Sequence, residues 1–138
     1  MKILKPLILL GCLALISLSC KKKIEQKAED MVMDAITHGD WIVEQYSEGS
    51  NNLSSLFLSY SFKFNSDGTL ISTANSVNTN GTWAPNVSDY TIDSEFPTAV
   101  DPLKKLNGVW KIKDSDWDYV KAQMPIGDST KTLILRKK

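Results

Sequence analysis

The sequence predicts an all-β domain, an eight-stranded antiparallel up-and-down β-barrel preceded by a short N-terminal helix. After residue 39 the chain holds about eight short segments in which apolar and polar residues alternate. Turn residues separate these segments and no helical pattern interrupts them, so consecutive segments should pair as antiparallel neighbours. Closure into a barrel would remove exposed edge strands, and a sandwich of two sheets is the alternative.

The first element is a helix predicted from Ile24 to His38. Its apolar residues fall on one face at helical spacing, with Met31 at the margin: Ile24, Ala28, Val32, Ala35 and Ile36. Gly39 is a favourable residue for ending it. We expect the apolar face to cover the open end of the barrel; the alternative is a solvated tether that becomes helical only near a membrane.

The first strands follow directly. Residues 41–47 are rich in β-formers, and residues 54–65 give the strongest strand signal because five apolar side chains, from Leu56 to Phe64, alternate with other residues. Asp67-Gly68 supplies the positive φ angles of a tight hairpin turn, and residues 69–73 form the return strand.

The later strands are predicted from the same alternation. They cover residues 81–83, 89–96, 106–113, 117–124 and 131–136, separated by expected turns or loops at 75–80, 97–105, 114–116 and 125–129. Residues 89–96 should place Tyr90, Ile92 and Phe96 on one face. Trp117 follows a charged turn, so it either lies at the barrel rim or points inward with Tyr119.

Residues 1–19 have the three parts of a secretory signal. Lys2 and Lys5 are its positive start, Leu7 to Leu18 is an apolar run, and small residues precede Cys20. The run is shorter than the roughly 20 residues that span a bilayer. No cysteine follows Cys20, so the mature chain cannot form an internal disulfide and must rest on its core.

The stretch Ile16-Ser-Leu-Ser-Cys-Lys resembles a bacterial lipobox. That resemblance implies that Cys20 becomes the first mature residue and carries acyl chains such as palmitate, which would anchor the protein to a bacterial membrane, the outer membrane first. The alternatives are an ordinary secretory signal and an uncleaved anchor. The chain then divides into a signal (residues 1–19), a lipidated cysteine with a basic tether and helix (20–38) and a barrel domain (39–138), which lies in the periplasm or at the cell surface.

The charge balance excludes one class of partner. Removing Lys2, Lys5 and the tether lysines Lys21 to Lys23 from the 16 basic residues leaves 11 against 16 acidic ones. The body is mildly acidic and has no basic stripe of the kind that nucleic acid requires. The tether lysines are suited to anionic lipid headgroups.

The sequence offers little for catalysis, so we expect no enzyme, no cofactor and no metal. His38 is the only histidine and lies at a predicted helix end. Asp114, Asp116 and Asp118 imitate the start of a calcium loop, but Tyr119 stands where Gly is needed and Pro125 where Glu is needed.

Gly39-Asp40-Trp41, at the start of the first strand after a helix, resembles the lipocalin pattern. The sequence also resembles bacterial lipid-anchored lipocalin-like proteins in the phrases Phe64-Asn65-Ser66-Asp67-Gly68-Thr69, Gly81-Thr82-Trp83 and Leu106-Asn107-Gly108-Val109-Trp110. The resemblance implies that Arg136, the only arginine, stacks on Trp41 and joins the two ends of the barrel.

The same resemblance implies a small apolar ligand in or at the mouth of the barrel. Candidate contact residues are the large inner side chains Tyr60, Phe62, Phe64, Trp83, Tyr90 and Trp110, together with Ile92 and Ile112. For each of them, plain core packing is the competing role. The alternative function is a non-enzymatic interaction module, an inhibitor or a subunit of an envelope complex, with a filled core and a protein partner that the sequence does not identify.

Overall fold

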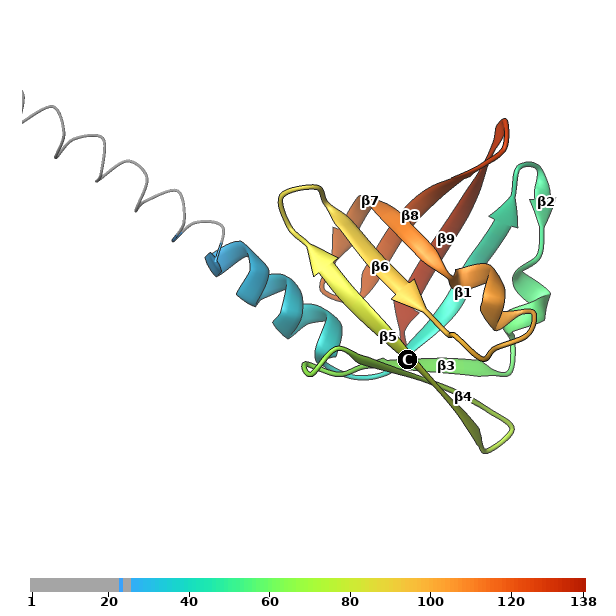
Figure 1. Cartoon of the computed structure of the whole chain (residues 1–138), viewed down its shortest axis with the longest axis horizontal. Helices are drawn as coiled ribbons and strands as arrows, with labels where there is room; N and C mark the ends of the chain where they lie inside the picture. Colours follow the sequence, from blue (N-terminus) through green and yellow to red (C-terminus); the bar gives the residue numbers. More distant parts are fainter. Residues whose placement is uncertain (1–22, 24–25) are drawn as a thin grey trace, which may run out of the picture.

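The computed structural model describes residue 23 and residues 26–138. A helix over residues 26–37 leads into a β-barrel (Figure 1). The strands are β1 (Trp41–Glu48), β2 (Asn51–Asn52), β3 (Tyr60–Phe64), β4 (Thr69–Ala74), β5 (Val77–Asn86), β6 (Thr91–Glu95), β7 (Gly108–Asp116), β8 (Tyr119–Ile126) and β9 (Ser129–Lys137), with 3-10 turns η1 (Ser54–Phe57) and η2 (Leu103–Leu106). The predicted signal (1–19) and Cys20 lie outside the described residues.

The sheet closes on itself. Strands β3 to β9 pair in chain order, all antiparallel, and β9 returns to β1 through paired residues from Trp41–Lys137 to Glu48–Lys131. On its other side β1 meets β3 at the pair Trp41–Phe62, and the short β2 pairs with the far end of β1. The prediction of an eight-stranded antiparallel barrel, formed by β1 and β3 to β9, is confirmed.

A bulge in β1 changes which residues point into the barrel. The pairing with β9 is irregular between Val43 and Gln45, so Glu44 is an extra residue. Trp41 and Val43 are buried before the bulge, and Tyr46 is buried after it. One inserted residue shifts the alternation by one position, which lets Tyr46 share the interior with Trp41.

The predicted strand over residues 54–65 is only half right. Residues Tyr60–Phe64 form β3, but Ser54–Phe57 form η1. Phe57 is 1% exposed although its position in the alternation pointed outward, whereas Leu58 is 84% exposed. The hydroxyl of Ser54 accepts a hydrogen bond from the backbone N–H of Tyr46 (2.9 Å), which holds this segment against the open side of β1 in place of a strand.

Three predicted turns are shorter than expected. Asn75 and Ser76, both with positive φ, make the whole β4–β5 turn, so β5 starts at Val77. Strand β7 continues to Asp116 and β8 to Ile126, beyond the predicted boundaries. The prediction that Tyr90 faces inward is wrong. Its backbone has φ of 53° in the turn before β6, and the residue is 67% exposed.

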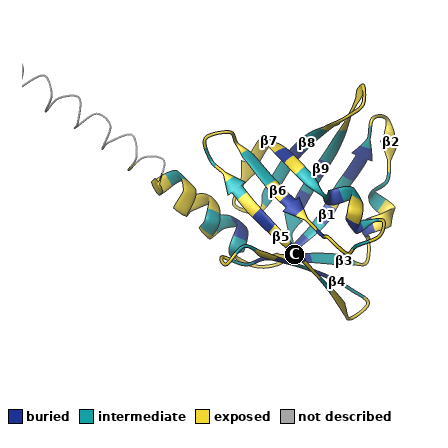
Figure 2. Ribbon diagram, viewed as in Figure 1, coloured by how far each residue is buried: buried dark blue, intermediate teal, exposed yellow. Residues whose placement is uncertain are grey.

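The buried residues are distributed along the barrel strands and the end of the helix (Figure 2), and their apolar members form one core. Its buried apolar members come from the helix, the two 3-10 turns, strands β1, β3 to β5 and β7 to β9, and Phe96 just after β6: Ile36, Trp41, Val43, Tyr46, Phe57, Phe62, Phe64, Leu70, Trp83, Phe96, Leu103, Leu106, Trp110, Ala122, Leu133 and Leu135. The helix joins this core through Ile36, which is 3% exposed. The expectation that its apolar face lies over one end of the barrel is therefore confirmed for the end of the helix that joins β1.

Candidate functional site

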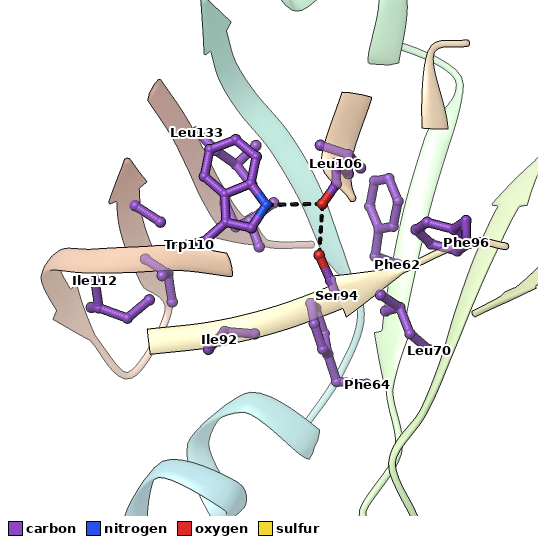
Figure 3. Close-up of a pocket in the computed structure, with 13 residues that line it drawn as sticks. Phe62, Phe64, Leu70, Ile92, Ser94, Phe96, Leu106, Trp110, Ile112 and Leu133 are labelled. Carbon is purple, nitrogen blue, oxygen red and sulfur yellow. Dashed lines mark hydrogen bonds between the residues drawn. The ribbon is translucent and has the colours of Figure 1, made fainter. Parts of the chain in front are cut away.

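The barrel interior holds only a small cavity. Its volume is about 40 Å³, and Phe62, Phe64, Trp110 and Leu133 are among the side chains around it (Figure 3). Sites for small organic ligands measure roughly 300–1,000 Å³. The interior therefore has room for water-sized occupants, and the candidate ligand contacts around it, Phe62, Phe64 and Trp110, act here as core.

Hydrogen bonds fix the polar atoms of this interior. The indole Nε1 of Trp110 and the hydroxyl of Ser94 both donate to the carbonyl oxygen of Leu106, at 2.8 and 2.7 Å (Figure 3). The indole Nε1 of Trp83 donates to the carbonyl oxygen of Asn65 at 2.9 Å. These bonds tie buried indoles to the chain on both sides of the barrel, since a buried donor is costly without a partner.

A larger cavity lies at the mouth of the barrel, beneath the helix. Its volume is about 230 Å³. Residues of the helix, β1, the end of β5, the β5–β6 turn and β6 to β8 form its walls: Ala28, Val32, Ala35, Ile36, Trp41, Pro85, Asn86, Val87, Tyr90, Thr91, Ile92, Ile112, Ser115, Asp116 and Val120. We call it the mouth cavity. Most of these side chains are apolar, and Asn86, Ser115 and Asp116 add polar groups.

Trp41 forms the floor of the mouth cavity and connects it to the helix. The side chain is 1% exposed, and its indole Nε1 donates to the carbonyl oxygen of Ile36 over 2.9 Å. Gly39 makes the intervening turn with φ of 83°, a backbone conformation that side chains other than glycine adopt with strain. A Cβ at this position would meet no atom within 4 Å, so the backbone angle is the reason that glycine is favoured here.

The predicted stack of Arg136 on Trp41 is wrong. Trp41 pairs with Lys137, whose Nζ lies 5.3 Å from the centroid of the indole ring. Arg136 is one residue away and lies on the outer face, where its guanidinium is 4.9 Å from the ring of Tyr119 and forms an ion pair with Glu44 at 3.0 Å. A cation over Trp41 still connects the first strand with the last, but it belongs to Lys137 and not to Arg136.

The rim beside the mouth cavity carries exposed aromatic residues. Trp117 is 53% exposed in the β7–β8 turn, so it lies at the rim and not inside the barrel. The Nζ of Lys137 lies 4.5 Å from its ring centroid. The Nδ1 of His38, in the turn after the helix, lies 3.3 Å from a carboxylate oxygen of Asp34, and the ring of His38 lies 6.0 Å from that of Trp117 between centroids.

The predicted ligand-binding residues line three separate cavities, except Trp83, which lies in the core. Phe62, Phe64 and Trp110 surround the small interior cavity, and Tyr90 lines the mouth cavity. Trp83 is buried and packs edge-on against Phe64. Tyr60 lines a separate open cleft at the other end of β5.

Several wall residues of the mouth cavity were not among the predicted ligand contacts. They are Val32 and Ala35 of the helix, and Pro85, Val87 and Val120 of the barrel. The apolar face of the helix was the one signal in the sequence that pointed to them.

The opposite end of the barrel holds a compact polar cluster. The hydroxyl of the buried Tyr46 donates to Glu48 Oε1 at 2.8 Å, and Lys105 Nζ donates to the same oxygen at 3.2 Å. Burial and the adjacent Glu48 raise the pKa of Tyr46 well above its ordinary value. The hydrogen bond from Tyr46, followed by that from Lys105, lowers the pKa of Glu48. The hydrogen bonds and the ion pair thus satisfy the polar groups of Tyr46 and Glu48 at this end of the barrel.

Within residue 23 and residues 26–138, no three metal-binding side chains of the His, Cys, Asp or Glu type come together. In the same part of the chain, none of the helices combines the length and apolar character needed to cross a bilayer.

The comparisons with known proteins find similarity in the fold. No protein-family model matches the chain, and no curated protein matches it. Among solved structures, it is similar to the crystal structure of a DUF4847 family protein from Bacteroides vulgatus ATCC 8482, with 16% sequence identity and a TM-score of 0.55. The match covers 75% of this chain and 95% of that chain. This chain therefore has a barrel fold similar to that of a DUF4847 family protein.

Proposed function

We propose that this protein is a lipid-anchored, lipocalin-like protein of the cell envelope that binds a small apolar molecule at the mouth of its barrel. The observation that carries the proposal is the contrast between two cavities: about 40 Å³ inside the barrel and about 230 Å³ at its mouth. The ligand binds between the helix and the barrel end. We infer that the protein acts by binding and not by catalysis.

The walls of the mouth cavity suit an elongated apolar molecule with one polar end. Val32, Ile92 and Ile112 are apolar and face it from the helix and from two strands. Asn86, Ser115 and Asp116 supply hydrogen-bonding groups. The volume is slightly below the range of roughly 300–1,000 Å³ for drug-sized sites. The ligand is therefore slender, such as a single acyl chain, or extends partly into solvent.

The position of the helix supports a role near a membrane. The helix extends away from the barrel on the side of the mouth cavity (Figure 1). It begins shortly after Cys20, the proposed site of lipid attachment. An anchor there would hold the mouth toward a bacterial membrane, for which we propose the outer membrane, with the barrel in the periplasm or at the cell surface. Apolar molecules are concentrated at a membrane, which the mouth of the barrel would then face.

Two tryptophan variants of the helix test this function. Val32 lines the mouth cavity, whereas its neighbour Met31 is 65% exposed and does not. We expect the purified full chain in detergent to bind cis-parinaric acid, a fluorescent fatty acid, saturably. Val32→Trp should fill the cavity and weaken binding by about tenfold or more, while Met31→Trp should leave it within about twofold. Equal binding by both variants would contradict the proposal.

A second candidate function rests on the filled interior. An interior cavity of about 40 Å³ is what a barrel with a purely structural core would show. Under this alternative, the protein is a non-enzymatic interaction module, an inhibitor or a subunit of an envelope complex. Absence of saturable cis-parinaric acid binding by the unmodified chain would favour it.

A further inference from the structure

Within the described residues, the first residues of β5 pair with a strand on one side only. Strand β5 pairs with β4 along residues 77–82, but with β6 only from the pair Thr82–Glu95 onward. The next positions along the β5–β6 ladder would place Pro97 opposite Asn80. Because proline has no backbone N–H, it ends the ladder there. Residues 77–80 of β5 therefore form a free sheet edge, since Gly81 still lies against Glu95 and Phe96.

The free edge presents the backbone of Asn78 and Asn80. In an antiparallel pair, alternate residues bond to opposite neighbours. The backbone N–H of Trp83 donates to the carbonyl oxygen of Gly68 at 2.9 Å, so the odd-numbered residues of β5 bond toward β4. Asn78 and Asn80 therefore direct their N–H and C=O groups away from β4. The repeat of two residues, about 6.6 Å, is that of any extended strand.

A cleft runs along this edge. Its volume is about 440 Å³, and it lies between the β5 edge and the 97–103 loop. Tyr60, Asn78, Thr79, Asn80, Thr98, Ala99, Val100, Asp101 and Leu103 line it. Within the described residues, no backbone hydrogen bond joins Asn78 or Asn80 to the loop across the cleft. The loop shields the edge at a distance without pairing with it.

We propose that this cleft binds an extended segment of a partner protein, which adds a strand to the edge of β5. The geometry of the unpaired N–H and C=O groups fits strand addition, the mode in which main-chain bonds give affinity and side-chain pockets give specificity. The cleft has one charged wall residue, Asp101. The segment therefore carries a lysine or arginine that faces Asp101, with small apolar side chains toward Tyr60 and Leu103.

This site is separate from the mouth cavity. The two lie against different parts of β5, residues 78–80 for the cleft and residues 85 and 86 for the mouth cavity. The partner segment binds without displacing the helix, and a ligand in the mouth cavity does not occupy the cleft. A negative binding result at one of the two sites therefore does not count against the proposal for the other.

Peptide titration tests the proposal. The probe is the acetylated and amidated peptide Thr-Val-Lys-Val-Thr, and the control is the same peptide with N-methyl groups at alternate residues, which removes the backbone donors along one edge of the extended peptide; both alternating patterns are tested. The full chain, ¹⁵N-labelled and in detergent, should show saturable amide shifts at residues 77–81 and 98–101. The N-methylated peptide should bind about tenfold more weakly or worse, because each hydrogen bond contributes an affinity difference of this order.

Matched variants of the edge complete the test. Asn80→Pro removes the one N–H of this residue that faces the cleft and keeps the bonds to β4, whereas Asn80→Ala keeps that N–H. We expect Asn80→Pro to lose about tenfold in peptide affinity and Asn80→Ala to stay within about twofold, with both thermal melting curves checked.

Three outcomes would overturn the proposal. They are no saturable shift with the probe peptide, equal binding of the N-methylated peptide, and unchanged binding by a folded Asn80→Pro. Shifts at the same amides caused by the neutral disaccharide diacetylchitobiose, and not by the peptide, would also overturn it and would make the cleft a sugar site.

Discussion

Trp41 donates a hydrogen bond from its indole Nε1 to the carbonyl oxygen of Ile36, at 2.9 Å, across the turn that joins the helix to the barrel. This bond fixes the helix over the barrel mouth, because both residues are almost completely buried. The mouth cavity exists only while the helix is held there. The position of Trp41 therefore connects the stability of the barrel to the shape of the proposed binding site.

Replacement of Trp41 should be severely destabilising. Trp41→Ala removes a fully buried indole and should lower the free energy of unfolding by about 3–5 kcal/mol. Trp41→Phe keeps an aromatic ring but loses the bond to Ile36, so its loss should be clearly smaller. Urea unfolding monitored by circular dichroism measures both. A loss near zero for Trp41→Ala would show that the residue does not plug the barrel.

Replacement of Arg136 should lower the free energy of unfolding far less than replacement of Trp41. Its ion pair with Glu44 is substantially exposed, at 40% and 46% of the two side chains. Exposed pairs contribute about 0–1 kcal/mol. Arg136→Ala also removes the contact with the ring of Tyr119, which contributes about 0.5–1 kcal/mol at an exposed site, so it should cost less than about 2 kcal/mol in urea unfolding. A cost comparable to that of Trp41→Ala would instead indicate the stack on Trp41 that the structure lacks.

Two buried serines should respond in opposite directions. The hydroxyl of Ser72 is buried and has no hydrogen-bond partner within the described residues, whereas that of Ser94 donates to Leu106. Ser72→Ala removes an unsatisfied polar group and should leave stability unchanged or raise it by about 1 kcal/mol. Ser94→Ala should lower it by about 1 kcal/mol. Melting temperatures that fall equally for both variants would contradict this distinction.

The Tyr46–Glu48 bond should make stability depend on alkaline pH. The pKa of Tyr46 is raised by folding above its ordinary value of 10.0, so the folded chain retains a proton that the unfolded chain releases. This contribution is complete below pH 10 and is lost as the pH rises above it. Urea unfolding between about pH 8 and about pH 11 should show a steeper decline for the native sequence than for Tyr46→Phe. Parallel declines would count against a proton held on Tyr46.

The Tyr46–Glu48 pair should also make stability depend on acid pH, where stability falls as the pH is lowered. The pKa of Glu48 is lowered by folding, so its contribution is present above its ordinary value of 4.5 and is lost as the pH falls below it. Glu48→Gln should flatten the decline in stability over that acid range, and Glu44→Gln, which changes an exposed carboxylate, is the control.

The lipid anchor has its own test. Cys20→Ala should abolish metabolic labelling with palmitate and release the protein from membranes into the soluble fraction, since acylation at Cys20 is the proposed attachment. Cys12→Ala, which changes the other cysteine, should leave both unchanged. Membrane fractionation of Cys20→Ala identical to that of the native chain would defeat the proposed anchor.

The alternation of side chains predicted most of the barrel because each strand has one buried face. Phe62 and Phe64 in β3 are buried as expected, and the predicted turn lies before β4. The turn comprises residues 65–68, and of the Asp67-Gly68 pair only Gly68 has a positive φ, of 87°. The alternation fails where an extra residue or a local bond intervenes. Nothing in the sequence marks Glu44 as a bulge, although it decides which later residues of β1 face inward.

The two errors near the closure of the barrel have related physical causes. Ser54 bonds to the backbone of Tyr46 and thereby draws residues 54–57 out of the strand that their alternation predicts. The pairing of β1 with β9 places Lys137, not Arg136, opposite Trp41. Register between strands distant in the chain depends on pairing that a single sequence does not display. The mouth cavity was predictable only as an apolar helix face above a barrel end.

Native mass spectrometry tests the central claim, that an apolar molecule binds under the helix at the mouth of a filled barrel. The full chain and its Val32→Trp variant would be purified from their own membrane in mild detergent. We predict a small, chemically apolar molecule bound to the native chain and lost from Val32→Trp. A native chain that carries no such molecule, or a Val32→Trp variant that carries as much, would contradict the account.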